Sequence, residues 1–286
     1  MSTAIITASN ISKHYGKKLA LDNISFTLPA GRIVGLIGPN GSGKTTLIKA
    51  LLGLAPFDGA LDVLGLDPRT QRDALMHEVS FIADVAILPR WLKVKNAVDF
   101  VEGVHPKFNR AKCEAYIANT KLQPNMKVSE MSKGMVVQLH LALVMAIDAK
   151  LLVLDEPTLG LDILYRRQFY QQLLEDYFDH NKTILIATHQ VEEIENILTD
   201  LMFIRDGKLT LNASMEEVNA RFIEVQVAPQ NIEAARAFKP IDERTQLGKT
   251  TMLFDGVAVE ALEQLGDCRN STVSDIFTSI MKGAQA

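Results

Sequence analysis

The segment at residues 38–46, GPNGSGKTT, constrains the fold of this 286-residue chain more than any other. It follows the apolar run 33–37, which fits a buried strand, and it leads into residues 45–54, whose apolar side chains have helical spacing. Only glycine lets successive backbone N–H groups crowd inward around phosphate oxygens, and a following helix adds its positive N-terminus. Strand, loop and helix together predict a phosphate-binding loop.

We expect the whole loop to hold the phosphates of a nucleotide. Lys44 should reach the β- and γ-phosphates, and the Thr45 hydroxyl should bind Mg²⁺. A glycine-rich turn with an unrelated lysine is the alternative, but it leaves the flanking strand and helix unexplained. The predicted nucleotide-binding residues here are Gly38, Pro39, Asn40, Gly41, Ser42, Gly43, Lys44, Thr45 and Thr46.

A shorter segment, residues 248–251, repeats the sequence GKTT. The position five residues before Gly248 is Glu243 rather than glycine, and no apolar strand leads into it. We therefore expect a turn that enters a strand, and not a second phosphate loop.

Two carboxylates follow the apolar run 151–154, which reads as a central strand. In open α/β sheets, ligands bind at such strand ends. Asp155 is expected to hold Mg²⁺ through water. Glu156 is expected to orient or deprotonate an attacking water, a role worth ~10²–10⁴ in rate. The alternative is an acidic strand end that faces solvent, which the phosphate loop nearby makes the poorer explanation.

Strand and helix patterns alternate along the chain, which predicts an α/β fold with a mainly parallel sheet and right-handed crossovers. We expect a P-loop NTPase core with an added antiparallel β segment, a helical insert at about 85–150, and a nucleotide-binding domain spanning 1–215. A hairpin is expected at Asp206-Gly207. Residues 216–286 should form a small C-terminal α/β appendage.

The appendage shows two patterns of its own. Ile223, Val225 and Val227 alternate with polar residues, as in a strand with one exposed face. From Val273 the apolar residues recur at helical spacing, which predicts an amphipathic helix opened by Ser271 or Thr272.

Composition limits the classes of function. With 47% hydrophobic and 22% charged residues the chain is typical of globular proteins. A net charge of −4 argues against dominant binding to nucleic acid. Two distant cysteines make no disulfide framework and fit a reducing compartment. We expect neither a signal peptide nor a membrane-spanning segment, so the chain should be soluble and able to dock on a membrane protein.

The order of motifs resembles that of the nucleotide-binding subunit of ATP-binding cassette (ABC) transporters, over about residues 3–212. The matching pieces are the phosphate loop, the 155–157 triplet, the 158–162 loop and Thr188-His189. The resemblance implies an ATPase that uses ATP and Mg²⁺. It makes Tyr15 the aromatic residue that stacks on adenine, His189 the switch histidine at the γ-phosphate, and Asp162 the aspartate of the inter-subunit loop. A tyrosine that only covers the sheet edge is the alternative for Tyr15.

The signature segment of that family usually reads LSGGQ, whereas residues 131–135 read MSKGM. Ser132 and Gly134 match, and the variant is similar to that of some bacterial exporter-type subunits. Ser132 should open a helix whose hydroxyl and amides make an anion site, although a simple N-cap would look the same. In the family this surface meets the γ-phosphate held by a second subunit. Lys133 either adds a cation there or is solvated.

The family also has a glutamine after its third strand, and the alignment puts Asp84 in that place. A carboxylate only accepts hydrogen bonds, whereas glutamine both accepts and donates. Asp84 is therefore a candidate Mg²⁺ ligand through water. Slower turnover or an altered metal preference is the hypothesis that follows.

The resemblance implies that Mg-ATP joins two such subunits, in a homodimer, and that hydrolysis powers transport through a separate integral membrane subunit at the cytoplasmic face of the membrane. Export is the expected direction. Trp91 is either an anchor for that partner or an intradomain packing residue. The appendage either supports the dimer or regulation, or it only packs.

Two other classes stay open. A soluble ABC ATPase acting on DNA, ribosomes or a protein assembly is the main alternative, although such proteins usually show a long coiled coil or tandem cassettes. A nucleotide switch that does not hydrolyse is the other, and the intact Glu156 and His189 argue against it.

Overall fold

The computed structural model describes residues 4–83, 88–179 and 181–283. The chain divides into two compact units, residues 1–198 with 204–209 and residues 199–203 with 210–286. The assignment of 1–215 and 216–286 as functional domains remains a prediction. Within the described residues, no helix is long and apolar enough to cross a lipid bilayer.

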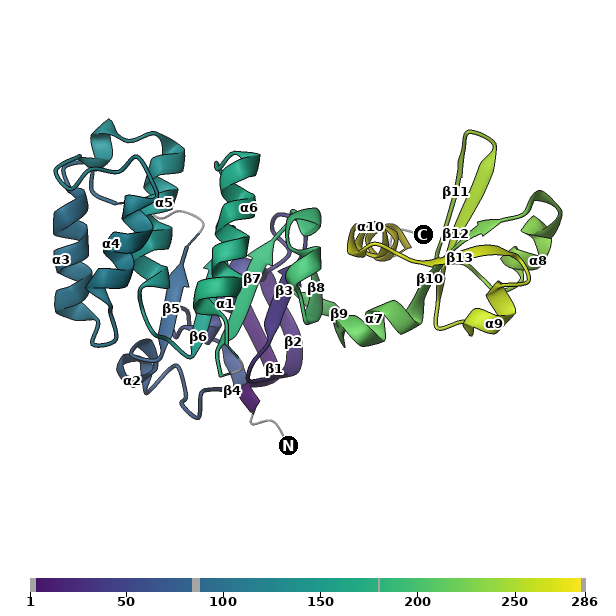
Figure 1. Cartoon of the computed structure of the whole chain (residues 1–286). Coiled ribbons are helices and arrows are strands. Elements are labelled where there is room, and N and C mark those ends of the chain that lie inside the picture. Colours follow the sequence, from purple (N-terminus) through teal and green to yellow (C-terminus); the bar gives the residue numbers. More distant parts are fainter. Residues whose placement is uncertain (1–3, 84–87, 180, 284–286) are drawn as a thin grey trace. The chain divides into compact units, whose positions relative to one another are not determined.

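Two sheets form the part of the chain before residue 215 (Figure 1). One has the strand order β2-β1-β4 with antiparallel pairing, and the other has the order β5-β6-β7-β3-β8-β9. In the second sheet, the neighbours β5–β6, β6–β7 and β3–β7 are parallel. The strands are β1 (Ala4–Tyr15), β2 (Lys18–Pro29), β3 (Ile33–Ile37), β4 (Asp58–Val63), β5 (Val79–Ile82), β6 (Leu151–Asp155), β7 (Thr183–Thr188), β8 (Asp200–Arg205) and β9 (Lys208–Ser214). The expected α/β class, with a mainly parallel sheet and an antiparallel β segment, is confirmed.

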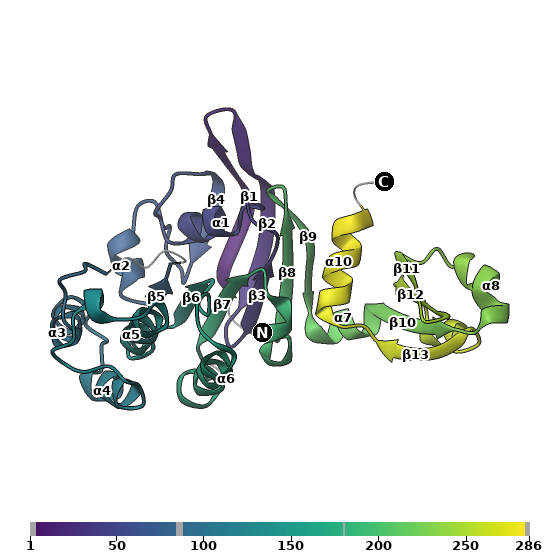
Figure 2. The same ribbon diagram turned by 90° about the horizontal axis from the view of Figure 1, so that it is seen from above.

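The helices of this part are α1 (Lys44–Leu51), α2 (Arg72–Met76), α3 (Val94–Val104), α4 (Arg110–Ala118), α5 (Lys133–Met145) and α6 (Ile163–Gln172). Helix α1 contacts β2 of the antiparallel sheet and β6 of the parallel sheet. Helices α3, α4 and α5 lie together beside β5 in both views (Figures 1 and 2). They share a buried apolar cluster that includes Val98, Cys113 and Leu139. Burial raises the pKa of the Cys113 thiol, which makes it an unreactive packing residue.

Single-turn and π-helical segments complete the description. The short 3₁₀ turns are Val128–Glu130, Val191–Glu193, Glu195–Ile197 and Pro229–Asn231, and a π-helical segment, Leu173–Tyr177, extends α6. Helix α1 ends at Leu51, three residues before the sequence pattern suggested. Gly53, with φ of 63°, turns the chain there.

The strand order explains how the predicted site forms. Strand β7 lies between β3 and β6, and all three run parallel, so their carboxyl ends meet at one edge of the sheet. In register, Ile37 pairs with Thr188 and Asp155 pairs with Ala187. Three segments therefore converge at this edge: the loop after β3, the two acidic residues at the end of β6, and the threonine and histidine at the end of β7.

The C-terminal unit is built on an antiparallel sheet of order β11-β12-β10-β13 (Figure 1). One face carries an apolar cluster that includes Ile223, Val225, Val227 and Phe254. From residue 215 on, the elements of this unit are α7 (Met215–Arg221), β10 (Phe222–Val227), α8 (Ile232–Arg236), β11 (Asp242–Gln246), β12 (Lys249–Asp255), α9 (Val259–Leu262), β13 (Gly266–Asn270) and α10 (Val273–Gly283). Helix α10 forms where its pattern predicts, and the Thr272 hydroxyl accepts from the backbone N–H of Asp275 (3.1 Å).

Residues 248–251 lie where a turn was expected. Leu247 and Gly248, with φ of 48° and 76°, form the turn between β11 and β12. The Asp206-Gly207 hairpin is also present, again with positive φ at both residues. The GKTT repeat is therefore a hairpin and not a phosphate loop.

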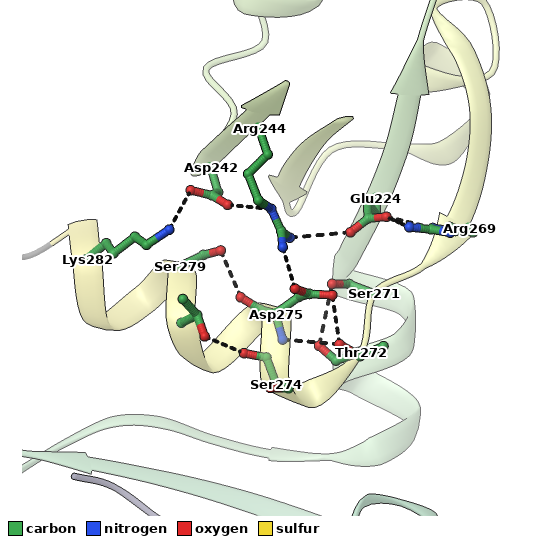
Figure 3. A network of polar contacts seen from close by, with 11 residues as sticks. Glu224, Asp242, Arg244, Arg269, Ser271, Thr272, Ser274, Asp275, Ser279 and Lys282 are labelled. Atoms are coloured by element: carbon green, nitrogen blue, oxygen red, sulfur yellow. Dashed lines mark hydrogen bonds and ion pairs between the residues drawn. The ribbon is translucent and has the colours of Figure 1, made fainter. Parts of the chain in front are cut away.

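The expectation of an exposed polar face on β10 is wrong at Glu224, which is 2% exposed. Figure 3 shows why: Arg269 and Arg244 hold its carboxylate from two sides. Arg269 Nε donates to Glu224 Oε1 at 2.6 Å, and Arg244 also pairs with Asp275 of α10 at 2.6 Å. Period-two patterning assigns a residue to a face of the sheet, but it does not show that charged partners will cover that face.

Glu224→Ala tests how far this buried carboxylate stabilises the C-terminal unit. Removing one partner of a fully buried pair costs ~3–5 kcal/mol, but the Arg269 side chain is 72% exposed and can regain water. We therefore expect a loss of ~1–2 kcal/mol, seen as faster amide hydrogen exchange across β10 and β13. The exposed Glu263→Ala is the control, and equal exchange in the two variants would show that the pairs do not stabilise the sheet.

Candidate functional site

The phosphate loop depends on glycine at two positions. Gly43 precedes α1 with φ of 116°, and a Cβ there would lie 2.8 Å from the carbonyl oxygen of Ala20. A Cβ on Gly38 would collide with the carbonyl oxygen of Ile204. No side chain fits at either position without moving backbone, so the close approach of the loop to its neighbours requires glycine.

Lys44 begins α1 and is buried against the loop. Its ammonium group donates to the carbonyl oxygens of Gly38 at 2.7 Å and Pro39 at 3.3 Å. The amine is thereby held across the mouth of the loop, where a lysine can reach phosphate oxygens.

Thr45 joins the loop to the acidic end of β6, because its hydroxyl donates to Asp155 Oδ2 at 2.8 Å. Hydroxyl and carboxylate oxygens are the hard ligands that Mg²⁺ takes when phosphates complete its shell. The Ser42 hydroxyl is buried, and among the described residues it has no hydrogen-bond partner. A buried hydroxyl in that state fits a ligand oxygen. The donor set therefore suits a magnesium nucleotide.

Glu156 stands at the centre of the site in an unusual backbone conformation. Its φ is 49°, a left-handed value that costs a non-glycine residue ~1–3 kcal/mol and that clusters at functional sites. Its N–H donates to the carbonyl oxygen of Ala187 at 2.9 Å, which ties it to β7. The side chain is only 11% exposed.

Three groups surround the Glu156 carboxylate. The Thr188 hydroxyl donates to Oε2 at 3.0 Å, and His189 Nδ1 lies 2.9 Å from Oε1. The Lys44 ammonium lies 3.8 Å from the same Oε1. The carboxylate is therefore fixed in direction between a histidine and the lysine of the phosphate loop, as a base that acts on a bound water would need to be.

A cleft of about 300 Å³ lies over the loop. Tyr15, the last residue of β1, is 48% exposed and forms one wall, with the Lys13 ammonium 5.0 Å from its ring centroid. The cleft brings together most of the predicted residues and adds Lys18 and Ala20, which the sequence did not point to. Its lining is Tyr15, Lys18, Ala20, Asn40, Gly41, Ser42, Gly43, Lys44, Thr45, Thr46, Asp155 and Glu156.

Among the described residues, Gly38, Pro39 and His189 flank this lining without being part of it, and three further predicted residues lie on other elements. Ser132 caps α5, accepting from the N–H of Met135 at 3.3 Å. Asp162 caps α6, accepting from the N–H groups of Leu164 and Tyr165 at 3.0 and 3.1 Å. Gly134 lies beside the 158–162 loop, since a Cβ on it would lie 3.7 Å from the Gly160 carbonyl oxygen. The structure thus places Ser132 and Gly134 beside the loop that ends at Asp162, and none of the three lines the cleft.

Two further predictions concern Asp84 and Trp91. Asp84 lies outside the described residues. Trp91 is 71% exposed, so its side chain is not an intradomain packing residue.

Sequence reasoning missed Thr188 as a partner of Glu156, although its place directly before His189 was a usable signal. It also missed Arg166 and Glu193, whose side chains pair between α6 and the turn after β7. Charged residues on helix surfaces are common, so nothing in the sequence separated these two from solvated ones.

Residues 21–159 match the family described as ABC transporter. The "Nod factor export ATP-binding protein I" of Paraburkholderia xenovorans (strain LB400) is 30% identical, with 97% of each chain covered. The protein of that name in Burkholderia orbicola (strain AU 1054) is 36% identical over 73% of this chain and 70% of its own.

Solved structures share the fold. An ATP-binding subunit of an ABC transporter superposes with a TM-score of 0.67 at 21% identity, covering 75% of this chain and 92% of that one. A bacterial Atm1-family ABC exporter with ATP bound gives 0.66 at 17% identity, over 75% of this chain and 40% of the exporter. The chain therefore belongs to the ABC transporter family, as one of its ATP-binding, ATP-hydrolysing subunits.

Proposed function

We propose that this chain hydrolyses Mg-ATP at the cleft over residues 38–46 and that hydrolysis drives export through a separate membrane subunit. The observation that carries the proposal is the setting of Glu156, whose carboxylate lies between His189 and Lys44 and next to the Thr45–Asp155 pair. The base Glu156, the cation Lys44 and the oxygens of Thr45 and Asp155 that suit a metal ion then lie within one site.

Each residue has a chemical part in the proposed reaction. Thr45 and Asp155 would hold Mg²⁺, which when bound neutralises phosphate charge. Lys44 exchanges its two carbonyl partners for phosphate oxygens and stabilises the charge that develops on the γ-phosphoryl group. Glu156, oriented by Thr188, accepts a proton from the attacking water. His189, beside Oε1 of that carboxylate, positions the water or the γ-phosphate. Tyr15 offers its exposed ring to the adenine.

A second copy of the chain would complete the site. Ser132, Gly134 and Asp162 lie near the N-termini of α5 and α6, away from the cleft of their own chain. A helix N-terminus attracts phosphate, so this surface suits the γ-phosphate bound by a partner. ATP would then join two copies, and hydrolysis would release them.

The proposed export role is supported by the relatives, which are named export ATP-binding proteins. These names favour transport over a soluble ABC ATPase. The exposed Trp91 is a suitable anchor for the membrane subunit, because aromatic residues lead interface hot spots. The chain would then work at the cytoplasmic face of the membrane, held there by its partner.

Replacing the proposed base tests the catalytic assignment. Glu156→Gln keeps the size of the side chain but removes its capacity to take a proton, so kcat for phosphate release should fall by ~10²–10⁴. Binding of ATP should persist, because the phosphate loop is unchanged. The exposed Glu175→Gln is the matched control. A Glu156→Gln protein that turns over ATP at the parent rate would make the assignment wrong.

Pairing of two copies is tested in the same Glu156→Gln background, by light scattering at saturating Mg-ATP. The mass should double on addition of ATP. Gly134→Asp should prevent this doubling, because it places a carboxylate where the partner's γ-phosphate is expected, while an added Cβ meets only ordinary contacts.

Gly103→Asp is the matched control, since Gly103 also lies in a helix with open space around it. It should leave the mass doubling intact. If Gly134→Asp pairs as readily as Gly103→Asp, the α5 surface does not meet the phosphates of a second copy.

A further inference from the structure

Arg166, on the first turn of α6, reaches two loops at once. Its Nε donates to the carbonyl oxygen of Leu161 at 2.8 Å, in the 158–162 loop. Its Nη1 donates to Gln190 Oε1 at 2.8 Å, in the residue directly after His189. One planar guanidinium group therefore connects the 158–162 loop to the segment that contains His189.

Glu193 contacts both Arg166 and the 158–162 loop. One of its carboxylate oxygens pairs with Arg166, and the other accepts from the Thr158 hydroxyl at 2.9 Å. The Arg166 and Glu193 side chains are only 23% and 20% exposed, so water screens the pair less than it would at the surface. Thr158 also lies 3.3 Å from the hydroxyl of Tyr170, and burial raises the pKa of that phenol and keeps it protonated.

Further hydrogen bonds connect the partners of Arg166 to the proposed base, Glu156. The N–H of Gln190 donates to the Thr188 hydroxyl at 3.0 Å, and that hydroxyl donates to Glu156 at 3.0 Å. A continuous set of hydrogen bonds thus runs from the Leu161 carbonyl through Arg166, Gln190 and Thr188 to Glu156.

We propose that Arg166, together with Glu193, is a positioning residue for hydrolysis. It fixes the 158–162 loop and the Thr188–Gln190 segment in one arrangement. Glu156 and His189 are then correctly oriented only while the 158–162 loop is in place. This inference rests on the proposed function, because it takes Glu156 and His189 as the residues that act on water. It also explains how a second copy that meets the Asp162 loop could influence hydrolysis in the chain that carries the loop.

Arginine is required by the geometry. Its fork donates to a backbone carbonyl, an amide oxygen and a carboxylate from fixed directions, whereas the compact ammonium group of lysine cannot span all three. Arg166→Lys should keep the pairing with Glu193 and lose part of the bridge to the loops.

The experiment measures phosphate release by the full chain, at varied Mg-ATP, for Arg166→Leu, Arg166→Lys and Glu193→Gln. Misplacement of reacting groups by a distant change costs ~10²-fold, so kcat of Arg166→Leu should fall by about that factor with KM unchanged. Arg166→Lys should fall between Arg166→Leu and the parent. The double variant Arg166→Leu/Glu193→Gln should be no slower than the slower single variant, as expected for residues that act as a unit.

Two controls separate the outcomes. Arg167→Leu removes the adjacent, exposed arginine of the same helix and should leave kcat unchanged. Glu156→Gln reports on the proposed function itself. If this variant is inactive while Arg166→Leu, Arg166→Lys and Glu193→Gln keep the parent kcat, Arg166 and Glu193 do not position the site. The proposed function would then stand. If Glu156→Gln is also fully active, the proposed function fails.

Thermal unfolding of each variant completes the test. A lower melting temperature with parent kcat would show that Arg166 only supports the fold, and it would overturn the proposal. Should Arg166→Leu not fold, the kcat values of Arg166→Lys and Glu193→Gln decide, since each keeps a polar side chain in place.

Discussion

The close approach of the backbone around the phosphate loop is the constraint on which the rest of the site depends. The carbonyl oxygen of Ser42 accepts from the N–H of Gly207, and the carbonyl oxygen of Gly207 accepts from the N–H of Asp22, both at 2.8 Å. Loop, hairpin turn and β2 are thereby locked together. Gly38 and Gly43 allow this contact because neither has a Cβ to separate the strands. These contacts within the chain hold the loop in its shape, and preorganisation of this kind lowers the cost of binding.

The parallel sheet then supplies the chemistry. A parallel pairing puts equivalent strand ends at one edge, and the order β6-β7-β3 brings the acidic pair, the histidine and the loop into one place. The left-handed backbone of Glu156 adds direction, because it turns the carboxylate toward His189 and Lys44. Neither the strand order nor this conformation follows from any single motif.

Much of this arrangement could be predicted from the sequence. The loop, the acidic strand end, Ser132 as the cap of α5 and the helix from Val273 all have local signals, namely glycine spacing, apolar runs and capping residues. The residues that sequence patterns missed depend on contacts between distant segments. Glu224 is buried because arginines from two other strands reach it, and Arg166 matters because Glu193 and Gln190, on the turn after β7, face it. The sequence does not show whether a polar side chain is solvated or bound to a charged partner, so only the fold distinguishes these cases.

We expect the loop at residues 38–46 to bind the phosphate groups of a nucleotide, with the adenine ring adding a contact to Tyr15. Calorimetric titration of the purified chain with ATP, and separately with adenosine, tests it most directly. ATP should bind, while adenosine, which has the same base and sugar but no phosphates, should bind too weakly to measure at the same concentrations. Equal affinity for the two ligands, or no binding of either, would contradict a phosphate site at residues 38–46.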